Sequence, residues 1–503
     1  MQRDDAVGSR RYLVDGAVLA GLTALAIFTR DRPLAPHSLF LDDAWVSVGY
    51  RSHGLAQLAR TTFTAPLFSF ATDLWLKAVG LTSLHAQMLA FVAGVVGPAA
   101  VYLVARSMRM NRAAALVAGA LLLFAPLHME YSSRVKEYTL DALLTAAVLV
   151  VAWRTLESPT RRRVIVLTAT AIVASVASLT VAPVVAGAFA ALTIRAVRTR
   201  THRVVAAIAT GSYALAAGSW WALVIRPASN SPLHRYWQIE DGFWTDDHLR
   251  VRSELGLTLA HVARGFSALP PALTLALLAL ATIVAFAHGI ERALLLVVPG
   301  ATALLLSAAN VAPIGGRVDI YLYPTFALLL AFAVEPLLRR RGWLVIAPIA
   351  LVAVLLSVTP LPRYYPNENL EPLVASLEAR AAPRDPIVIY RMSVWGFALY
   401  TRWPVRFVRS ATGAVPFTAD VARPDIYEVA GGRPANVVDP IEDRRRVDRI
   451  WFLGSHARLV TDDAETRTFE TDGFRLVSHL GNHSAWLDEF VRAPRHAHAT
   501  TTA

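Results

Sequence analysis

Apolar residues in this chain gather in long runs that are separated by short charged segments. A run of roughly 17–25 apolar residues is long enough to cross a bilayer as a helix. The pattern predicts a polytopic α-helical membrane protein, in which the fifth and sixth runs form either a hairpin or one broken helix near Pro183. About eleven runs reach that length: 12–29, 86–105, 113–128, 138–155, 164–180, 181–197, 204–225, 268–288, 291–310, 318–336 and 343–360.

Basic residues predict the orientation of these spans, because Lys and Arg concentrate in short cytoplasmic loops. With the N-terminus in the cytoplasm, the inner loops carry the basic clusters around 106–112, 154–163, 195–203, 292 and 339–341. The short outer loops then hold only Arg134, Lys136 and Arg317. Removing one helix would move the last cluster outside, so charge favours eleven spans and an extracytoplasmic C-terminus. The first span follows Arg10-Arg11 without a small-residue cleavage site, which predicts a retained signal anchor.

Composition supports the same class of protein. Hydrophobic residues make up 55% of the 503 residues and charged residues only 17%, whereas a soluble domain is nearer a quarter charged. The net charge of +12 is explained by the inner loops, so nucleic acid is not expected as a partner. Cysteine is absent, which excludes disulfides and thiolate metal sites. The strong preference for Arg over Lys is typical of a GC-rich bacterium, and we expect a multi-pass protein of the bacterial plasma membrane.

Two outer segments are too long for plain connectors. The first, about 30–85, has apolar pairs at helical spacing, including Leu67-Phe68, and predicts short helices in the membrane interface with Trp75 and Lys77 at headgroup level. The second, about 226–265, is either an interfacial aromatic belt or a loop that contacts substrate. Its polar and aromatic residues are Trp237, Trp244, Asp246, Asp247 and His248.

The pattern changes at about residue 361, which divides the chain into a transmembrane domain (1–360) and a small soluble extracytoplasmic α/β domain (361–503). Residues 371–382 and 395–401 have helical character, whereas 386–390 and 449–453 are short β-branched or aromatic runs typical of buried strands. The last residues, rich in His, Ala and Thr, are expected to be disordered.

Asp42 and Asp43 follow the first span within Phe40-Leu41-Asp42-Asp43-Ala44-Trp45. Such a pair can be a solvated loop or the N-cap of a helix that starts near Ala44. It can also supply a general base that deprotonates an acceptor hydroxyl. One carboxylate suffices for inverting transfer by direct displacement, whereas retention requires a second carboxylate as nucleophile.

Cations on the same side provide candidates for binding a phosphate. In the loop after the third span, Arg134, Tyr138 and Asp141 fall on one helical face. Lys136 is one of only two lysines, which favours a point-charge donor, although both cations could equally extend to lipid headgroups. Arg317 lies at the outer mouth of the tenth span, as either an interfacial anchor or a second phosphate ligand.

These segments together resemble the GT-C membrane glycosyltransferases, and most closely the family-39-like group of protein O-mannosyltransferases and bacterial aminoarabinose lipid A transferases. The similarity covers roughly residues 10 to 365. It consists of Asp42-Asp43, Ala65-Pro66-Leu67, Lys136-x-Tyr138-x-x-Asp141 and the Arg317 to Pro324 segment. The family often has Asp-Glu and Pro-Pro-Leu in the first two motifs. The Asp-Asp version is also similar to mycobacterial arabinosyltransferases, so a hexose and a pentose both remain open as the donor sugar.

The resemblance implies that Asp42, or else Asp43, is the base and that Lys136, Arg134, Tyr138 and Arg317 bind the donor phosphate. Nucleotide sugars are cytoplasmic, so an outer site requires a donor such as a polyprenyl-phosphate sugar, whose tail lies in membrane lipid. The expected product is a glycolipid, cell-wall polysaccharide or protein, with the acceptor undetermined. The sequence shows no convincing metal cluster, but a divalent cation bridging Asp42 and the phosphate stays open. The alternatives are a transporter or flippase for a lipid-linked saccharide, and an assembly protein with a degenerate site; uncharged spans argue against transport.

Overall fold

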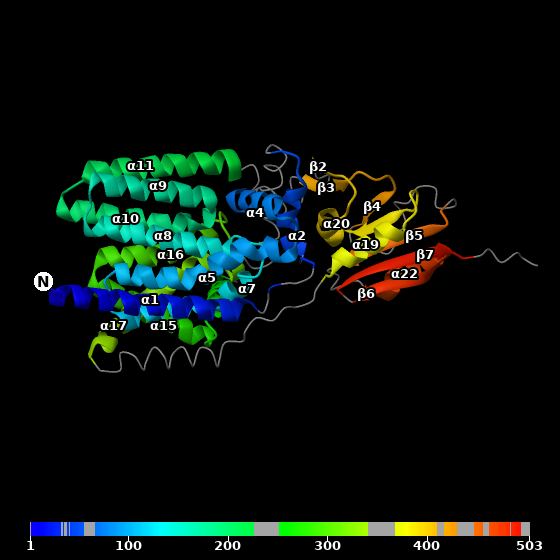
Figure 1. Ribbon diagram of the computed structural model, residues 1–503. Helices are drawn as coiled ribbons and strands as arrows, with labels where there is room; N and C mark the ends of the chain where they lie inside the picture. The colour runs from blue at the N-terminus through cyan, green and yellow to red at the C-terminus, as the bar shows by residue number, and fades with distance from the viewer. Residues whose placement is uncertain are drawn as a thin grey trace, which may run out of the picture.

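The computed structural model describes residues 2–31, 34, 38–39, 41–54, 66–225, 251–340, 368–409, 417–429, 447–455, 462–482 and 484–493. Long helices form a bundle, and the α/β part of the chain lies at one end of it (Figure 1). The long helices are α1 (Gln2–Asp31), α5 (Ser83–Ser107), α6 (Arg112–Leu123), α8 (Tyr138–Glu157), α9 (Arg161–Ala177), α10 (Ala182–Thr199), α11 (Arg203–Trp220), α15 (Pro271–His288), α16 (Ile290–Ala308) and α17 (Tyr323–Arg340).

Membrane-spanning character is clear from length and composition. Within the described part of the chain, 7 helical stretches are long and apolar enough to cross a bilayer, and Arg112–Leu123 is a shorter apolar helix. The prediction of a helical membrane protein is therefore confirmed, but a count of eleven spans is not. The last predicted span, 343–360, lies outside the described residues.

Two of the predicted spans differ in detail from the helices observed. The run at 113–128 is divided into α6 and the short helix α7 (Pro126–Tyr131). Ala125 adopts an extended conformation because the following proline disfavours the helical one. The runs around Pro183 are separate helices, α9 and α10, joined by the 3₁₀ turn η2 (Leu179–Val181).

Short elements cover the end of the bundle that faces the α/β part (Figure 1). The predicted interfacial helices of the first outer loop are present as α2 and α4. These elements are α2 (Leu41–Ser47), η1 (Val48–Arg51), α4 (Pro66–Val79), α7, η3 (Trp221–Ile225), α14 (Val251–Phe266) and η4 (Gly316–Leu322). Of the residues singled out in the second long loop, none lies within the described residues.

The C-terminal part contains a five-stranded sheet in the order β4-β1-β5-β7-β6 and a separate pair β2-β3. β1 pairs in parallel with β4 and β5, whereas β7 is antiparallel to β5 and β6. Its elements are α19 (Leu370–Arg380), β1 (Ile387–Tyr390), η5 (Arg391–Ser393), α20 (Val394–Tyr400), β2 (Val405–Arg409), β3 (Phe417–Val421), β4 (Ile426–Val429), β5 (Arg449–Ser455), α22 (Asp462–Thr471), β6 (Phe474–Asn482) and β7 (Ala485–Arg492).

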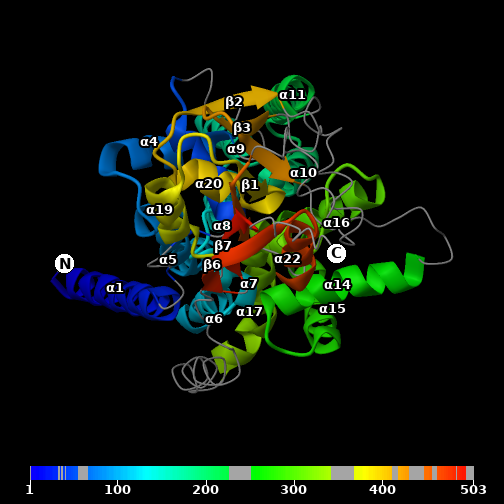
Figure 2. The same ribbon diagram turned by 90° about the vertical axis from the view of Figure 1, so that its right-hand side faces the viewer.

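Successive side chains of a strand point to opposite faces of the sheet, and in this sheet both faces are apolar. Ile387, Trp451 and Leu453 pack with α19 and α20, whereas Val388 and Phe452 belong to the core that includes Phe469 of α22. Figure 2 shows the sheet end-on with these helices around it. The predicted small α/β fold is therefore present, although the boundary near residue 361 and the terminal tail lie outside the described residues.

Candidate active site

Helix α2 carries Asp42 and Asp43 in its first turn, where the helix dipole favours negative charge. The helix is only two turns long, and its other side packs on the apolar cluster that includes Ala44 and Val46. Because successive residues of a helix point about 100° apart, the two carboxylates meet different neighbours. The side chain of Asp42 is 23% exposed and that of Asp43 only 3%.

Two cations from distant segments meet Asp42. Arg317 Nη1 lies 3.0 Å from Asp42 Oδ2, and Lys136 Nζ lies 3.8 Å from the same oxygen. Arg317 comes from η4, whereas Lys136 comes from the turn before α8. We call Asp42, Lys136 and Arg317 the Asp42 cluster. The sequence placed its members in three separate segments, and the fold brings them together.

Asp43 instead contacts the backbone of the turn before α8. Val135 N donates to Asp43 Oδ1 at 2.9 Å, and Arg134 Nη1 lies 3.5 Å from Asp43 Oδ2. Burial raises the pKa of the Asp43 carboxyl, and the nearby Arg134 and Lys136 oppose that shift. Asp43 therefore fixes the turn that carries Lys136, and it is far less accessible than Asp42.

The turn before α8 is also held by a close approach between α5 and the end of α7. A Cβ on Gly94 of α5 would lie 2.1 Å from Ser132 Oγ, so only glycine fits there. Ser132 Oγ accepts a hydrogen bond from Arg30 Nε at 3.1 Å, and Arg30 also contacts His128 Nδ1 at 2.9 Å. Arg30 is fully buried, so these contacts position the turn and do not offer a cation to solvent.

Tyr138 and its neighbours form the wall beside the Asp42 cluster. Tyr131 and Tyr138 meet edge-to-face with ring centroids 5.1 Å apart. Burial raises the pKa of Tyr131, which the adjacent Arg317 guanidinium opposes. Asp141 points elsewhere and accepts a hydrogen bond from Thr180 Oγ1 at 2.8 Å.

The expectation that Arg134, Tyr138 and Asp141 share one helical face is wrong for Arg134. Helix α8 begins at Tyr138, and Arg134 belongs to the preceding turn. The physical reason is local: the Arg134 carbonyl accepts the Lys136 amide at 2.9 Å in a tight turn, whereas in a helix it would accept the amide of Tyr138.

The donor set offers little to a resident metal ion. Among the residues that the structure describes, no group of three or more His, Cys, Asp or Glu side chains could hold one. The Asp42 carboxylate is already paired with two cations. Within the part of the chain that the structure describes, the residues around Asp42 do not fit a metal held by the protein alone.

The C-terminal domain holds the segment around α2. Leu41 N donates to Glu368 Oε2 at 2.9 Å and Leu39 N to Tyr400 Oη at 2.6 Å. At the other end, Arg51 donates to the backbone oxygens of Thr401 and Trp403. Sequence reasoning missed these contacts, since nothing in a periodicity pattern links residues more than 300 positions apart.

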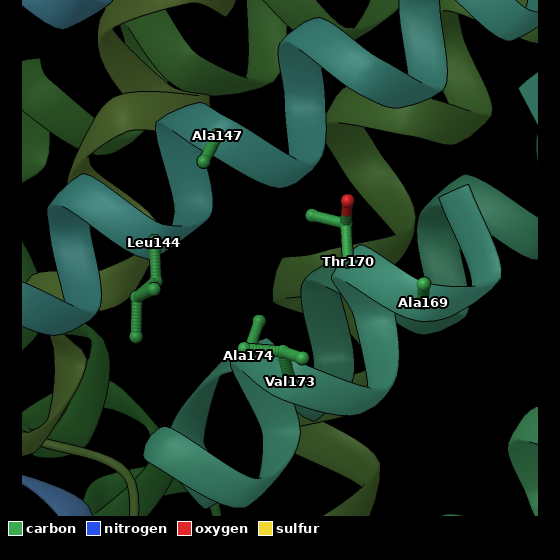
Figure 3. A pocket seen from close by; sticks show the side chains of 6 residues that line it. All are labelled: Leu144, Ala147, Ala169, Thr170, Val173 and Ala174. Atoms are coloured by element: carbon green, nitrogen blue, oxygen red, sulfur yellow. The ribbon is translucent and has the colours of Figure 1, made fainter. Parts of the chain in front are cut away.

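An apolar hollow of about 290 Å³ lies between α8 and α9. Its lining has no charged side chain, as Figure 3 shows. The hollow is therefore separate from the chemistry of the Asp42 cluster. It is lined by Leu144, Ala147, Ala169, Thr170, Val173 and Ala174.

Comparison with known proteins relates this architecture to a solved fold. No family model and no curated protein sequence matches the chain. The crystal structure of ArnT from Cupriavidus metallidurans in the apo state is similar over 96% of this chain and 98% of ArnT, with a TM-score of 0.55 and 14% identity. The same protein bound to undecaprenyl phosphate is similar over the same shares, with a TM-score of 0.53 and 14% identity.

The crystal structure of the Archaeoglobus fulgidus oligosaccharyltransferase is similar over 86% of this chain and 67% of the oligosaccharyltransferase, with a TM-score of 0.49 and 10% identity. The ArnT likeness extends over both the helical bundle and the C-terminal domain, because it leaves almost none of either chain out. The resemblance inferred from the sequence is confirmed for the fold, because the architecture of ArnT is found over almost the whole of this chain.

Proposed function

We propose that this protein is a membrane glycosyltransferase that moves a sugar from a polyprenyl-phosphate donor to an acceptor hydroxyl on the outer face of a bacterial plasma membrane. The observation that carries the proposal is the meeting of one accessible carboxylate with Lys136 and Arg317. The fold supports it, since ArnT, which has the same architecture, binds undecaprenyl phosphate. In this orientation the N-terminus is cytoplasmic and the C-terminal domain lies outside.

The reaction we infer is a single displacement. Asp42 accepts the proton of the acceptor hydroxyl as the hydroxyl oxygen attacks the anomeric carbon of the donor. The bond from that carbon to the phosphate oxygen breaks, and its electron pair leaves with the polyprenyl phosphate. In this scheme the configuration at the anomeric carbon inverts, because the displacement is single and no second carboxylate is assigned as a nucleophile.

Lys136 and Arg317 are assigned to the donor phosphate. Before the donor binds, the two cations are paired with Asp42. The phosphate then competes for them and gains charge when the sugar leaves, so the cations stabilise the transition state more than the ground state. Their transfer from Asp42 to phosphate also frees the carboxylate to act as a base.

Arg134 and Tyr138 take supporting positions in this scheme. Arg134 is 30% exposed and paired with Asp43, so it can add positive potential at the rim of the site. Tyr138 is buried against Tyr131 and shapes the wall near the phosphate. We do not assign the base to Asp43, because Asp43 is buried and accepts the Val135 amide.

The proposal is tested with radiolabelled polyprenyl-phosphate sugars in native membranes, which supply the acceptor. A mannosyl and an arabinosyl lipid compare hexose with pentose transfer. The wild-type protein should form a new glycosidic product, and the variant Asp42→Asn should not, although it is expressed and folded. Full transfer by the variant would refute Asp42 as the base. For the transporter alternative, the decisive observation is movement of the lipid-linked sugar across vesicles without a new glycosidic bond.

A further inference from the structure

Two tryptophans from different domains meet beside the Asp42 cluster. Trp45 lies on α2, three positions after Asp42, which places both on one side of the helix. Trp395 lies on α20 of the C-terminal domain. The two ring centroids are 6.2 Å apart, and the ring planes are inclined at 36°. The pair therefore joins α2 to the C-terminal domain, and Figure 1 shows α2 beside α20.

The pair is directly next to the charged groups. Lys136 Nζ lies 5.2 Å from the centre of the Trp45 ring and 3.8 Å from Asp42 Oδ2. One ammonium group thus touches both the aromatic pair and the carboxylate. A molecule that lies on the aromatic pair has its edge within reach of the atoms that we assign to catalysis.

The two rings are only half-buried, unlike the tryptophans that stabilise the C-terminal domain. Trp451 and Trp486 are buried in its cores. Trp403 is also half-buried, and its ring packs against Phe397 and the Arg423 guanidinium within the C-terminal domain. Trp45 and Trp395 instead lie at the domain boundary beside the Asp42 cluster, and each keeps part of its side chain accessible.

The contacts between the domains fix this arrangement. Glu368, in a left-handed conformation with φ 68°, accepts the Leu41 amide at the start of α2. Tyr400, at the end of α20, accepts the Leu39 amide. Both helices that carry the tryptophans are thereby tied at their ends, and a preformed aromatic surface loses little entropy on binding.

We propose that Trp45 and Trp395 form a saccharide subsite, in which a sugar ring lies on the aromatic surface with its hydroxyls toward the Asp42 cluster. A sugar ring has an apolar face of C–H groups with partial positive charge, and the π-face of tryptophan carries partial negative charge. This subsite deepens the proposed function and rests on it. The ring could belong to the acceptor or to the donor, and the experiment separates the two.

The test uses the full-length protein in detergent. Methyl mannopyranoside, methyl galactopyranoside and methyl arabinofuranoside are titrated as probes while tryptophan fluorescence is recorded. We expect a saturable change with at least one probe. Trp395→Leu and Trp45→Leu should each weaken that binding about tenfold or more. The matched control Trp403→Leu should bind as wild type does, because that ring packs against Phe397 and Arg423 and is not part of the Trp45–Trp395 pair.

Folding is checked by gel filtration and thermal unfolding of each variant. If a leucine variant is not folded, Trp395→Phe keeps a smaller aromatic face and should give intermediate affinity. The absence of saccharide binding by the wild type, or equal binding by folded Trp395→Leu, would overturn the subsite. Equal losses in Trp395→Leu and Trp403→Leu would overturn it too, since they would indicate a general effect on the domain.

Lipid binding identifies the source of the ring and separates the two proposals. Undecaprenyl phosphate should bind wild type and Trp395→Leu equally, and failure to bind wild type would count against the proposed function alone. If Trp395→Leu weakens binding of an undecaprenyl-phosphate sugar but not of undecaprenyl phosphate, the subsite holds the donor sugar. If both lipids bind unchanged while the methyl glycosides are lost, the subsite holds the acceptor.

Discussion

Asp42 and Asp43 are neighbours in sequence, but they lie on different sides of α2 and have different surroundings. On the Asp42 side, a partly exposed carboxylate faces two cations at 3.0 and 3.8 Å. On the Asp43 side, a buried carboxylate accepts a backbone amide and faces one guanidinium at 3.5 Å. The printed contacts of Asp42 are with the side chains of Arg317 and Lys136, whereas those of Asp43 include the main chain of the turn before α8.

This difference shows how one acidic pair can serve two purposes. A buried acceptor that satisfies a main-chain amide contributes to folding, because removing it leaves a buried donor without a partner. In our proposal the phosphate of the donor competes with the partly exposed Asp42 carboxylate for Lys136 and Arg317. We therefore propose Asp42 as the reacting group and Asp43 as the group that positions the turn of Lys136.

The largest effect is expected from exchanging the two acids for amides. Asp42→Asn removes the base and should lower the rate of sugar transfer about 10²-fold or more. Asp43→Asn retains an oxygen that can accept the Val135 amide and should lose far less. The measurement is transfer of labelled sugar in membranes that contain equal amounts of each folded variant. A greater loss in Asp43→Asn would reverse the two assignments.

Removal of a cation should have the next largest effect. A charged hydrogen bond contributes about 1.5–3 kcal/mol, so Lys136→Ala or Arg317→Ala should weaken binding of undecaprenyl phosphate about 10- to 150-fold. Lys77→Ala is the matched control, because Lys77 donates to Ser52 O and lies outside the Asp42 cluster. Binding is measured by titration of the lipid into purified protein. If Lys136→Ala and Lys77→Ala bind undecaprenyl phosphate with equal affinity, Lys136 does not bind the donor phosphate, and its interaction with lipid headgroups would be the better interpretation.

Truncation of Asp43 should instead affect stability. In Asp43→Ala the Val135 amide loses its acceptor, at a cost of about 1–3 kcal/mol. The free energy of unfolding in detergent should fall by that amount, whereas Asp42→Ala, which keeps the Val135 amide paired with Asp43, should lower it less. Equal destabilisation by both variants would contradict the division between the two sides.

Sequence patterns predicted much of this molecule where local rules apply. Hydrophobic run length predicted the helices of the bundle, and aromatic and β-branched runs predicted β1 and β5. Motif order placed Asp42, Lys136 and Arg317 on one side of the membrane. Their distances, and the choice between Asp42 and Asp43, depend on tertiary contacts such as Gly94 against Ser132. The meeting of Trp45 with Trp395 has no local signal at all, because it depends on how two domains dock.

The smallest effect concerns pH. Burial raises the folded-state pKa of Asp43 above the ordinary value of about 3.9. Between these two values the folded protein binds more protons at this residue than the unfolded chain does, so its contribution to stability is greatest below about pH 4 and falls as pH rises through the raised pKa. Thermal unfolding from pH 4 upward should therefore show a steeper decline for wild type than for Asp43→Asn, which does not titrate. The opposite difference in slope would mean that the attraction of Arg134 and Lys136 outweighs burial, and Asp43 would then share the exchangeable character that we assign to Asp42 alone.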